Sequence, residues 1–140
     1  MSYQQVFRED LDLVYSRFGA TVRLADVKQC AVATFRDPRY RPGMRELIDF
    51  RAAKAVDPQL RFDSIREIWE TQSTWIQRLR GDADVVLVGS SDLAFGLIRM
   101  YASLALTDSK RFSPCRTWDA ACEVLAIDPT VALLADAAES

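Results

Sequence analysis

The sequence contains no histidine among its 140 residues. This absence excludes Ser-His-Asp hydrolysis, two-histidine metal motifs and haem ligation by imidazole, because each of them needs an imidazole ring. Cysteine is scarce as well: Cys30, Cys115 and Cys122 are odd in number and show no Cys-x-x-Cys spacing. We interpret them as small core residues rather than zinc ligands. We therefore predict no metal site, no cofactor and no catalytic residues, and expect a protein that is not an enzyme.

Charge of one sign and long hydrophobic runs are also lacking. The 18 basic and 20 acidic residues give a net charge of −2, so the chain has no strong positive field and we expect no nucleic-acid partner. No apolar run approaches the roughly 20 residues that span a bilayer. The first residues lack the charged and apolar regions of a signal peptide. We expect a cytoplasmic protein without membrane insertion.

What is present is the composition of a folded domain. The apolar fraction of 49% over 140 residues is enough for one hydrophobic core. No repeat or change of composition divides the chain, so we predict one domain over residues 1–128 and a short extension over 129–140. Asp128-Pro129 has the form of an N-cap followed by a first-turn proline, which indicates that the extension is helical.

Strand and helix patterns alternate along the domain. The apolar periodicity predicts strands near residues 6–8, 11–18, 47–50 with 55–56, 85–88 and 111–117. It predicts helices near 21–36, 64–80, 92–106 and 118–126, the second of which opens on a capping-box pattern at Ser64. The fully apolar run Val85–Val88 is typical of a central parallel strand with helices on both faces. The predicted fold class is α/β, with a mixed sheet of four to five strands and helical cover.

A binding edge is predicted where these strands end, because open α/β sheets hold ligands at the carboxyl ends of parallel strands. The polar residues expected there are Asp49, Asp57, Ser64, Ser90, Ser91 and Asp92. The alternative is that Ser64 and one of the last three residues are only helix caps. A buried Asp49 could act as a general base, but pairing with Arg51 is the other interpretation, and no second acid or nucleophile is placed beside it.

The predicted helix 92–106 carries more apolar residues than one sheet contact needs, in two adjoining stripes. Phe95, Arg99 and Leu106 lie on its remaining side. Aromatic residues and arginine are enriched in protein interfaces, so this side predicts a homodimer or a protein partner. The alternative is that the C-terminal extension covers the helix.

The stretch from Phe35 to Leu125 resembles small bacterial proteins of the STAS-like fold, the fold of anti-sigma-factor antagonists and a relative of CRAL-TRIO lipid-binding domains. The matching residues are Asp37-Pro38, Pro42–Arg51, Ala94–Tyr101 and Trp118–Ala121. In members that act as phospho-switches, a strand ends in Asp-Ser-Ser-Gly and the first serine is phosphorylated. This chain departs from that pattern, because Pro58 follows Asp57 where the serine is expected.

The resemblance and the missing catalytic residues together predict a regulatory or protein-interaction module, dimeric and not enzymatic. The alternative is a domain that binds a small molecule or lipid at the carboxyl edge of the strands. Trp69, Trp75 and Trp118 would line such a pocket, or they are ordinary packing residues. Phosphorylation of Ser64, Ser90 or Ser91 at a helix N-terminus is also left open.

Overall fold

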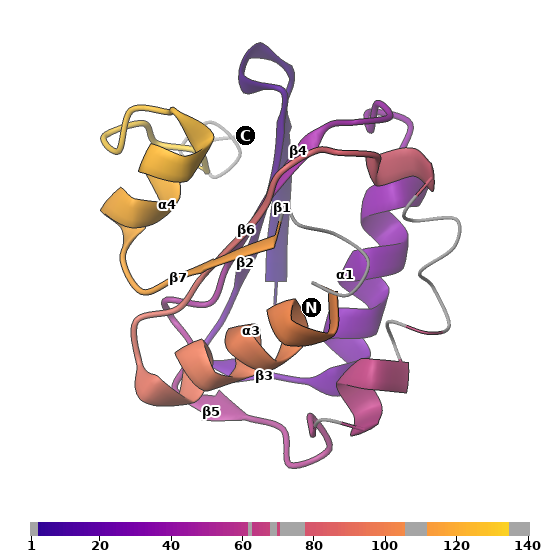
Figure 1. Cartoon of the computed structure of the whole chain (residues 1–140), viewed down its shortest axis with the longest axis vertical. Coiled ribbons are helices and arrows are strands. Elements are labelled where there is room, and N and C mark those ends of the chain that lie inside the picture. The colour runs from indigo at the N-terminus through magenta and orange to yellow at the C-terminus, as the bar shows by residue number, and fades with distance from the viewer. Residues whose placement is uncertain (1–2, 62, 68–69, 71–77, 106–111, 135–140) are drawn as a thin grey trace.

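A mixed sheet of five strands forms the centre of the protein. The computed structural model describes residues 3–61, 63–67, 70, 78–105 and 112–134. The strands stand in the order β1-β2-β4-β6-β7 (Figure 1). Their bounds are Tyr3–Arg8, Leu13–Phe18, Arg45–Asp49, Val85–Val88 and Phe112–Cys115. β1 is antiparallel to β2 and every other neighbouring pair is parallel, so the α/β prediction with a mixed sheet is confirmed.

The strand sequences explain this order. All four residues of β6 are buried, as the apolar run predicted for a central strand covered on both faces. Pro114 lies in β7, which is the edge strand next to β6. Proline has no N–H to donate to a ladder, so an edge strand is where a sheet accepts it.

The segment predicted as one irregular strand over 47–56 is in fact two strands in different sheets. The chain leaves the main sheet after β4. β5 (Ala55–Val56) then pairs in parallel with β3 (Thr21–Val22) in a separate two-stranded sheet. Because residues 21–22 are used in this pairing, α1 begins at Leu24 rather than at the predicted residue 21. It ends at Arg36, before the predicted stop at Asp37-Pro38.

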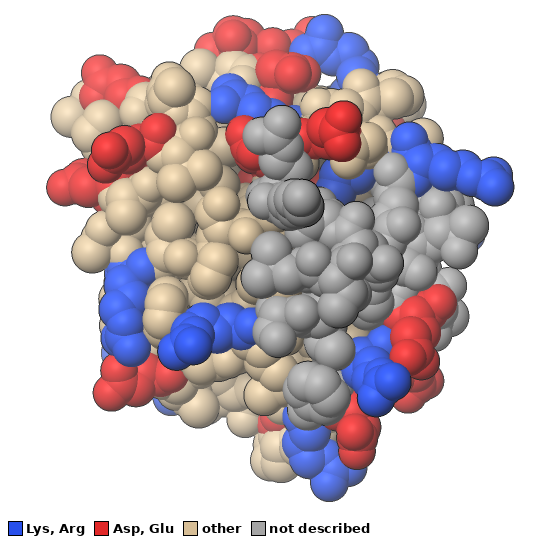
Figure 2. Space-filling view, viewed as in Figure 1, with Lys and Arg blue, Asp and Glu red and all other residues tan. Residues whose placement is uncertain are grey.

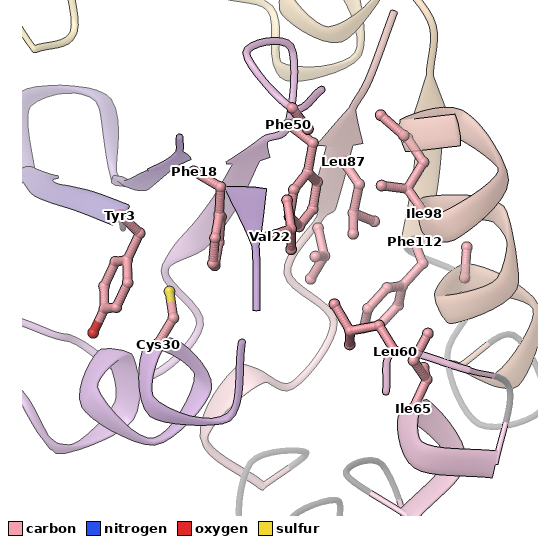
Figure 3. Close-up of a cluster of buried hydrophobic side chains, with 14 residues drawn as sticks. Tyr3, Phe18, Val22, Cys30, Phe50, Leu60, Ile65, Leu87, Ile98 and Phe112 are labelled. Atoms are coloured by element: carbon pink, nitrogen blue, oxygen red, sulfur yellow. The ribbon is translucent and has the colours of Figure 1, made fainter. Parts of the chain in front are cut away.

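The helices divide between the two faces of the sheet. α1 (Leu24–Arg36) and α3 (Asp92–Ala105) lie on one face, and α4 (Trp118–Leu125) lies on the other (Figure 1). Figure 3 shows the largest of the three buried apolar clusters, in which side chains from the sheet meet those from α1 and α3. The sheet residues alternate between the two faces with a period of two, because successive side chains of a strand point to opposite faces.

Backbone contacts fix the starts of the last two helices. A Cβ added at Gly89 would lie 3.0 Å from the Cβ of Ala94, so the first turn of α3 approaches the end of β6 as closely as only glycine permits. α4 starts at the N-cap Thr117, whose side chain accepts a hydrogen bond from the N–H of Ala120. Arg45 holds the other end of α4 by donating to the carbonyl of Leu125 at 2.5 Å.

The C-terminal extension does not form the predicted helix over its described part. Residues 127–134 form turns, in which Asp128 accepts a hydrogen bond from the N–H of Thr130 at 2.9 Å instead of capping a helix. Leu133 and its neighbours pack beside α4, on the opposite face of the sheet from α3 (Figure 1). The described part of the extension therefore does not cover α3. Across the described ranges, no helix is long and apolar enough to cross a bilayer.

Candidate functional site

The residues predicted at the end of β6 act as a helix cap and an ion-pair partner. Ser91 Oγ accepts a hydrogen bond from the N–H of Ala94 at 3.1 Å, so Ser91 is the N-cap of α3. Asp92 accepts from Arg116 at 2.9 Å, and its side chain is 94% exposed. Ser90 is exposed beside them. The capping alternative is the one that the structure supports here.

Asp57 and Ser64 stabilise local turns. Asp57 Oδ1 accepts from the N–H of Gln59 at 2.9 Å, and Oδ2 accepts from the N–H of Leu24 at 3.3 Å. Ser64 already lies within a helical turn, and its hydroxyl oxygen accepts from the N–H of Arg61 at 2.8 Å. The predicted capping box is therefore wrong at Ser64, because this residue does not precede the helix.

Asp49 lies apart from these residues, in a buried polar cluster on the α4 side of the sheet. It is 1% exposed. Its Oδ2 accepts from Tyr15 Oη at 2.5 Å and from Arg51 Nη2 at 3.0 Å. The guanidinium of Arg51 lies 4.0 Å from the ring centroid of Trp118. Burial, and then the charge of Asp49, raises the pKa of Tyr15 above its ordinary value. The predicted Asp49–Arg51 pair is present, as part of a network that locks these side chains together.

A pocket of about 260 Å³ opens beside this cluster. Tyr15, Arg51 and Trp118 line it together with residues 131–134 of the extension. Trp118 Nε1 also donates to the carbonyl of Pro129 at 2.9 Å, which ties the extension to α4. Trp69 and Trp75, the other tryptophans considered for a pocket, lie outside the described residues. Tyr15 and Arg51 are hydrogen-bonded to Asp49, whereas Arg17, which also lines this pocket, is exposed.

A second cavity, of about 60 Å³, lies on the other side of the sheet. We call it the α1–α3 cavity, because α1, α3 and the strands β2, β4 and β6 contribute most of its described lining. The walls are mainly apolar; Figure 3 shows Phe18, Phe50, Ile65 and Ile98 directed toward this interior region from different elements. A polar cavity of this size has room for several water molecules, and an apolar one can hold a small apolar group.

One buried ion pair interrupts the apolar wall. Arg80 donates from Nε to Glu46 Oε2 at 2.6 Å and from Nη2 to Oε1 at 3.2 Å. The two side chains are 5% and 6% exposed. Burial acts to lower the pKa of Arg80, but the Glu46 carboxylate outweighs it and the pKa is raised. The guanidinium also lies 5.2 Å and 4.9 Å from the ring centroids of Phe35 and Phe112.

The remaining nitrogen of this guanidinium, Nη1 of Arg80, is buried without a hydrogen-bond partner among the described residues. Other polar groups in the wall are satisfied. Gln5 Nε2 donates to Ser16 at 2.9 Å and to Thr34 at 2.7 Å. The Tyr101 hydroxyl interacts with Arg80, which lowers the pKa of Tyr101 by less than burial raises it. The α1–α3 cavity thus combines apolar walls with a single unpaired donor.

The predicted interface residues lie on a mixed surface of α3. Phe95 is half-buried, with the guanidinium groups of Arg116 and Arg99 at 4.2 Å and 6.0 Å from its ring centroid. Arg99 is exposed and Leu93 is 51% exposed. Leu106 lies outside the described residues. In the view of Figure 2, acidic and basic side chains are interspersed around the edge of the molecule.

The two apolar stripes of α3 have separate uses within the chain. Ala94, Ile98 and Ala102 are almost fully buried in the core against the sheet. Leu97 and Tyr101, on the adjoining side, line the α1–α3 cavity. The cavity wall therefore accounts for Leu97, whereas Leu93 on the same side of α3 stays 51% exposed.

Glu46 and Arg80 were not among the site residues predicted from the sequence. A signal existed at Glu46, because the period of two places it on the same strand face as Ile48 and Phe50, where a charge is unexpected. No such signal existed at Arg80, because a basic residue before Gly81 is typical of an exposed helix end. Tyr15 was missed as well, because its alternation with Leu13 marks it only as a core residue.

Comparisons with protein-family models, with curated proteins and with solved structures find no significant match. The STAS-like resemblance therefore stays a prediction. Among the side chains that the structure describes, no group of three or more cysteine, aspartate or glutamate residues is placed to hold a metal ion.

Proposed function

We propose that this protein binds a small, mainly apolar molecule in the α1–α3 cavity. The supporting observation is a cavity of about 60 Å³ with apolar walls and one buried, unpaired donor. Protein interiors are close-packed, and an unfilled cavity costs stability. Ligand pockets, by contrast, combine apolar walls with a few polar groups that orient the ligand. Binding by this arrangement requires no catalytic residue.

This proposal adopts the small-molecule alternative from the sequence and changes its place. The carboxyl edge of the strands was the expected site, but Asp57, Ser64, Ser90 and Asp92 do not line the cavity. The site proposed here lies between the helices and the sheet, where Leu97 and Tyr101 of α3 face α1.

Benzene is a suitable first probe, because it enters apolar cavities without needing a polar contact. We expect a benzene titration to shift the backbone amide NMR signals of residues around the cavity, such as Val27 and Leu97. Ala31→Leu places a larger side chain in the cavity wall and should abolish these shifts. Ala25→Leu is the matched control, because Ala25 is exposed on the same helix and does not line the cavity.

The proposal is wrong if wild-type protein shows no such shifts, or if Ala31→Leu and Ala25→Leu respond to benzene alike. Shifts confined to residues around Trp118 would place binding in the pocket on the opposite face of the sheet instead.

A protein-interaction function is the second candidate, supported by the exposure of Leu93 (51%) and of Arg99 on α3, where Phe95 is half-buried. It predicts a homodimer with twice the chain mass in size-exclusion chromatography with light scattering. Phe95→Glu should convert this species to a monomer, whereas Val124→Glu, at an exposed position of α4, should leave it dimeric. A wild-type protein that stays monomeric at the highest soluble concentration would contradict this homodimer.

A further inference from the structure

We infer that the ligand of the α1–α3 cavity is an uncharged carbonyl compound whose oxygen accepts a hydrogen bond from Arg80 Nη1. This inference rests on the proposed function and names the chemical class that the cavity selects. Its starting point is that Nη1 is the one buried side-chain nitrogen or oxygen without a partner in the described part of the chain.

The surroundings of Arg80 hold this donor in place. Nε and Nη2 are both bound to Glu46, at 2.6 Å and 3.2 Å, so the plane of the guanidinium is fixed. The rings of Phe35 and Phe112 lie 5.2 Å and 4.9 Å from its centre. Nη1 therefore cannot turn toward another acceptor without breaking the ion pair. A ligand that supplies an acceptor completes the hydrogen bonding of the guanidinium.

Charge decides which acceptor is favoured. The positive charge of Arg80 is already balanced by Glu46, and the two side chains are only 5% and 6% exposed. A carboxylate in the cavity would add an unbalanced negative charge, whose removal from water is costly. A hydrocarbon would cover Nη1 and leave it unpaired. A ketone or amide oxygen avoids both penalties.

The other polar side chains of the wall are engaged within the protein, and the Tyr101 hydroxyl among them interacts with Arg80 itself. Ser16 and Thr34 both accept from Gln5, at 2.9 Å and 2.7 Å. Thr34 also donates to the carbonyl of Cys30 at 2.8 Å. The cavity therefore favours a ligand that carries one hydrogen-bond acceptor and is otherwise apolar.

Three probes with the same number of carbons test this selection: 2-pentanone, pentanoate and pentane. Amide NMR titrations of wild-type protein should show 2-pentanone binding at least tenfold more tightly than pentanoate. In the double variant Glu46→Leu/Arg80→Met, which removes the donor together with its counter-ion, the affinity ratio of 2-pentanone to pentane should fall at least tenfold. The inference is overturned if this ratio is unchanged, or if pentanoate binds as tightly as the ketone.

A measurement on wild-type protein alone keeps the test independent of the variant's folding. The infrared C=O stretch of bound, carbon-13-labelled 2-pentanone should lie at lower frequency than in an alkane solvent, as expected for a carbonyl that accepts a hydrogen bond from a cation. A stretch at the alkane value would refute the contact with Arg80 while leaving the proposed function standing. If none of the probes, pentane included, shifts residues of the cavity, the proposed function fails as well.

Discussion

Arg80→Met is expected to lower the free energy of unfolding by about 3–5 kcal/mol, because it leaves a buried carboxylate without its cation. Glu46 is 5% exposed and sits on β4 in the middle of the sheet, so water cannot easily replace the guanidinium. The substitution keeps a long apolar side chain against Phe35 and Phe112, so most of the loss comes from the charge. Urea denaturation near neutral pH measures it, with the slope of the transition as a check on two-state behaviour.

Two variants separate the buried charge from a general effect of losing an arginine. Arg66→Met removes the partner of Glu70 in an ion pair whose side chains are 58% and 63% exposed, and should cost about 0–1 kcal/mol. The double variant Glu46→Leu/Arg80→Met removes both charges and should recover most of the loss, because replacing a buried pair by apolar residues is often neutral or stabilising.

Equal losses in Arg80→Met and Arg66→Met would show that the Glu46–Arg80 pair is not buried as described. A double variant as unstable as the single one would show that packing, not charge, accounts for the loss. The double variant is also the one used to test carbonyl binding, so its stability matters for that experiment.

The elements that the sequence predicted correctly are those whose residues have only one reasonable environment. Val85–Val88 is apolar throughout and became the buried β6, and Asp37-Pro38 ended α1 because proline cannot continue a helix. The Asp49–Arg51 pair was also predicted, although Arg51 lies in the turn after β4, where its N–H donates to Asp49 Oδ1 as well.

The predictions that failed depended on local patterns that tertiary contacts override. Ser64 had the sequence of a capping box, yet its hydroxyl bonds to the turn at Arg61 because the helix has already begun. Asp128-Pro129 had the form of a helix start, but the extension instead packs against the α4 side of the sheet through Leu133. Its turns are held by contacts with Trp118 that no local pattern encodes.

The α1–α3 cavity could not be predicted because its two key residues are far apart in the chain. Glu46 and Arg80 are separated by 34 residues and meet only after the sheet and its helices have assembled. The sequence did report an excess of apolar residues on α3, and we interpreted it as an interface. Leu97 and Tyr101 show that the same excess can line an internal cavity. Amphipathic patterns identify apolar faces but not what fills the space beside them.

Raising the pH above 9 is expected to destabilise the protein steeply. Burial raises the pKa of Cys30 from 9.0 to about 11 and, with the charge of Glu46, that of Tyr40 from 10.0 to about 12. At these pH values the unfolded chain loses protons that the folded chain keeps, so the free energy of unfolding falls as pH rises. Since one pKa unit corresponds to about 1.4 kcal/mol, each group removes about 3 kcal/mol over its window.

The pH ranges over which Cys30 and Tyr40 lower stability differ. Single variants can therefore show which of the two residues causes the loss in each range. Cys30→Ala should flatten the loss of stability between pH 9 and pH 11, the ordinary and raised pKa values of this thiol. Tyr40→Phe should flatten it between pH 10 and pH 12. It also loses the hydrogen bond to the Leu79 carbonyl at 3.1 Å, which lowers stability equally at every pH below these windows. Urea denaturation across the range separates the constant loss from the change in slope.

Tyr15 provides a third, distinct contribution, because its hydroxyl donates to a carboxylate rather than to a backbone carbonyl. Its pKa is raised by burial and by the charge of Asp49, against the opposing effect of Arg51. Tyr15→Phe should therefore flatten the fall in stability above pH 10 while leaving the fall between pH 9 and pH 10, which comes from Cys30, unchanged. If all three variants lose stability with pH as steeply as wild-type protein, these side chains are not buried in the folded state, and the cores on both faces of the sheet are looser than described.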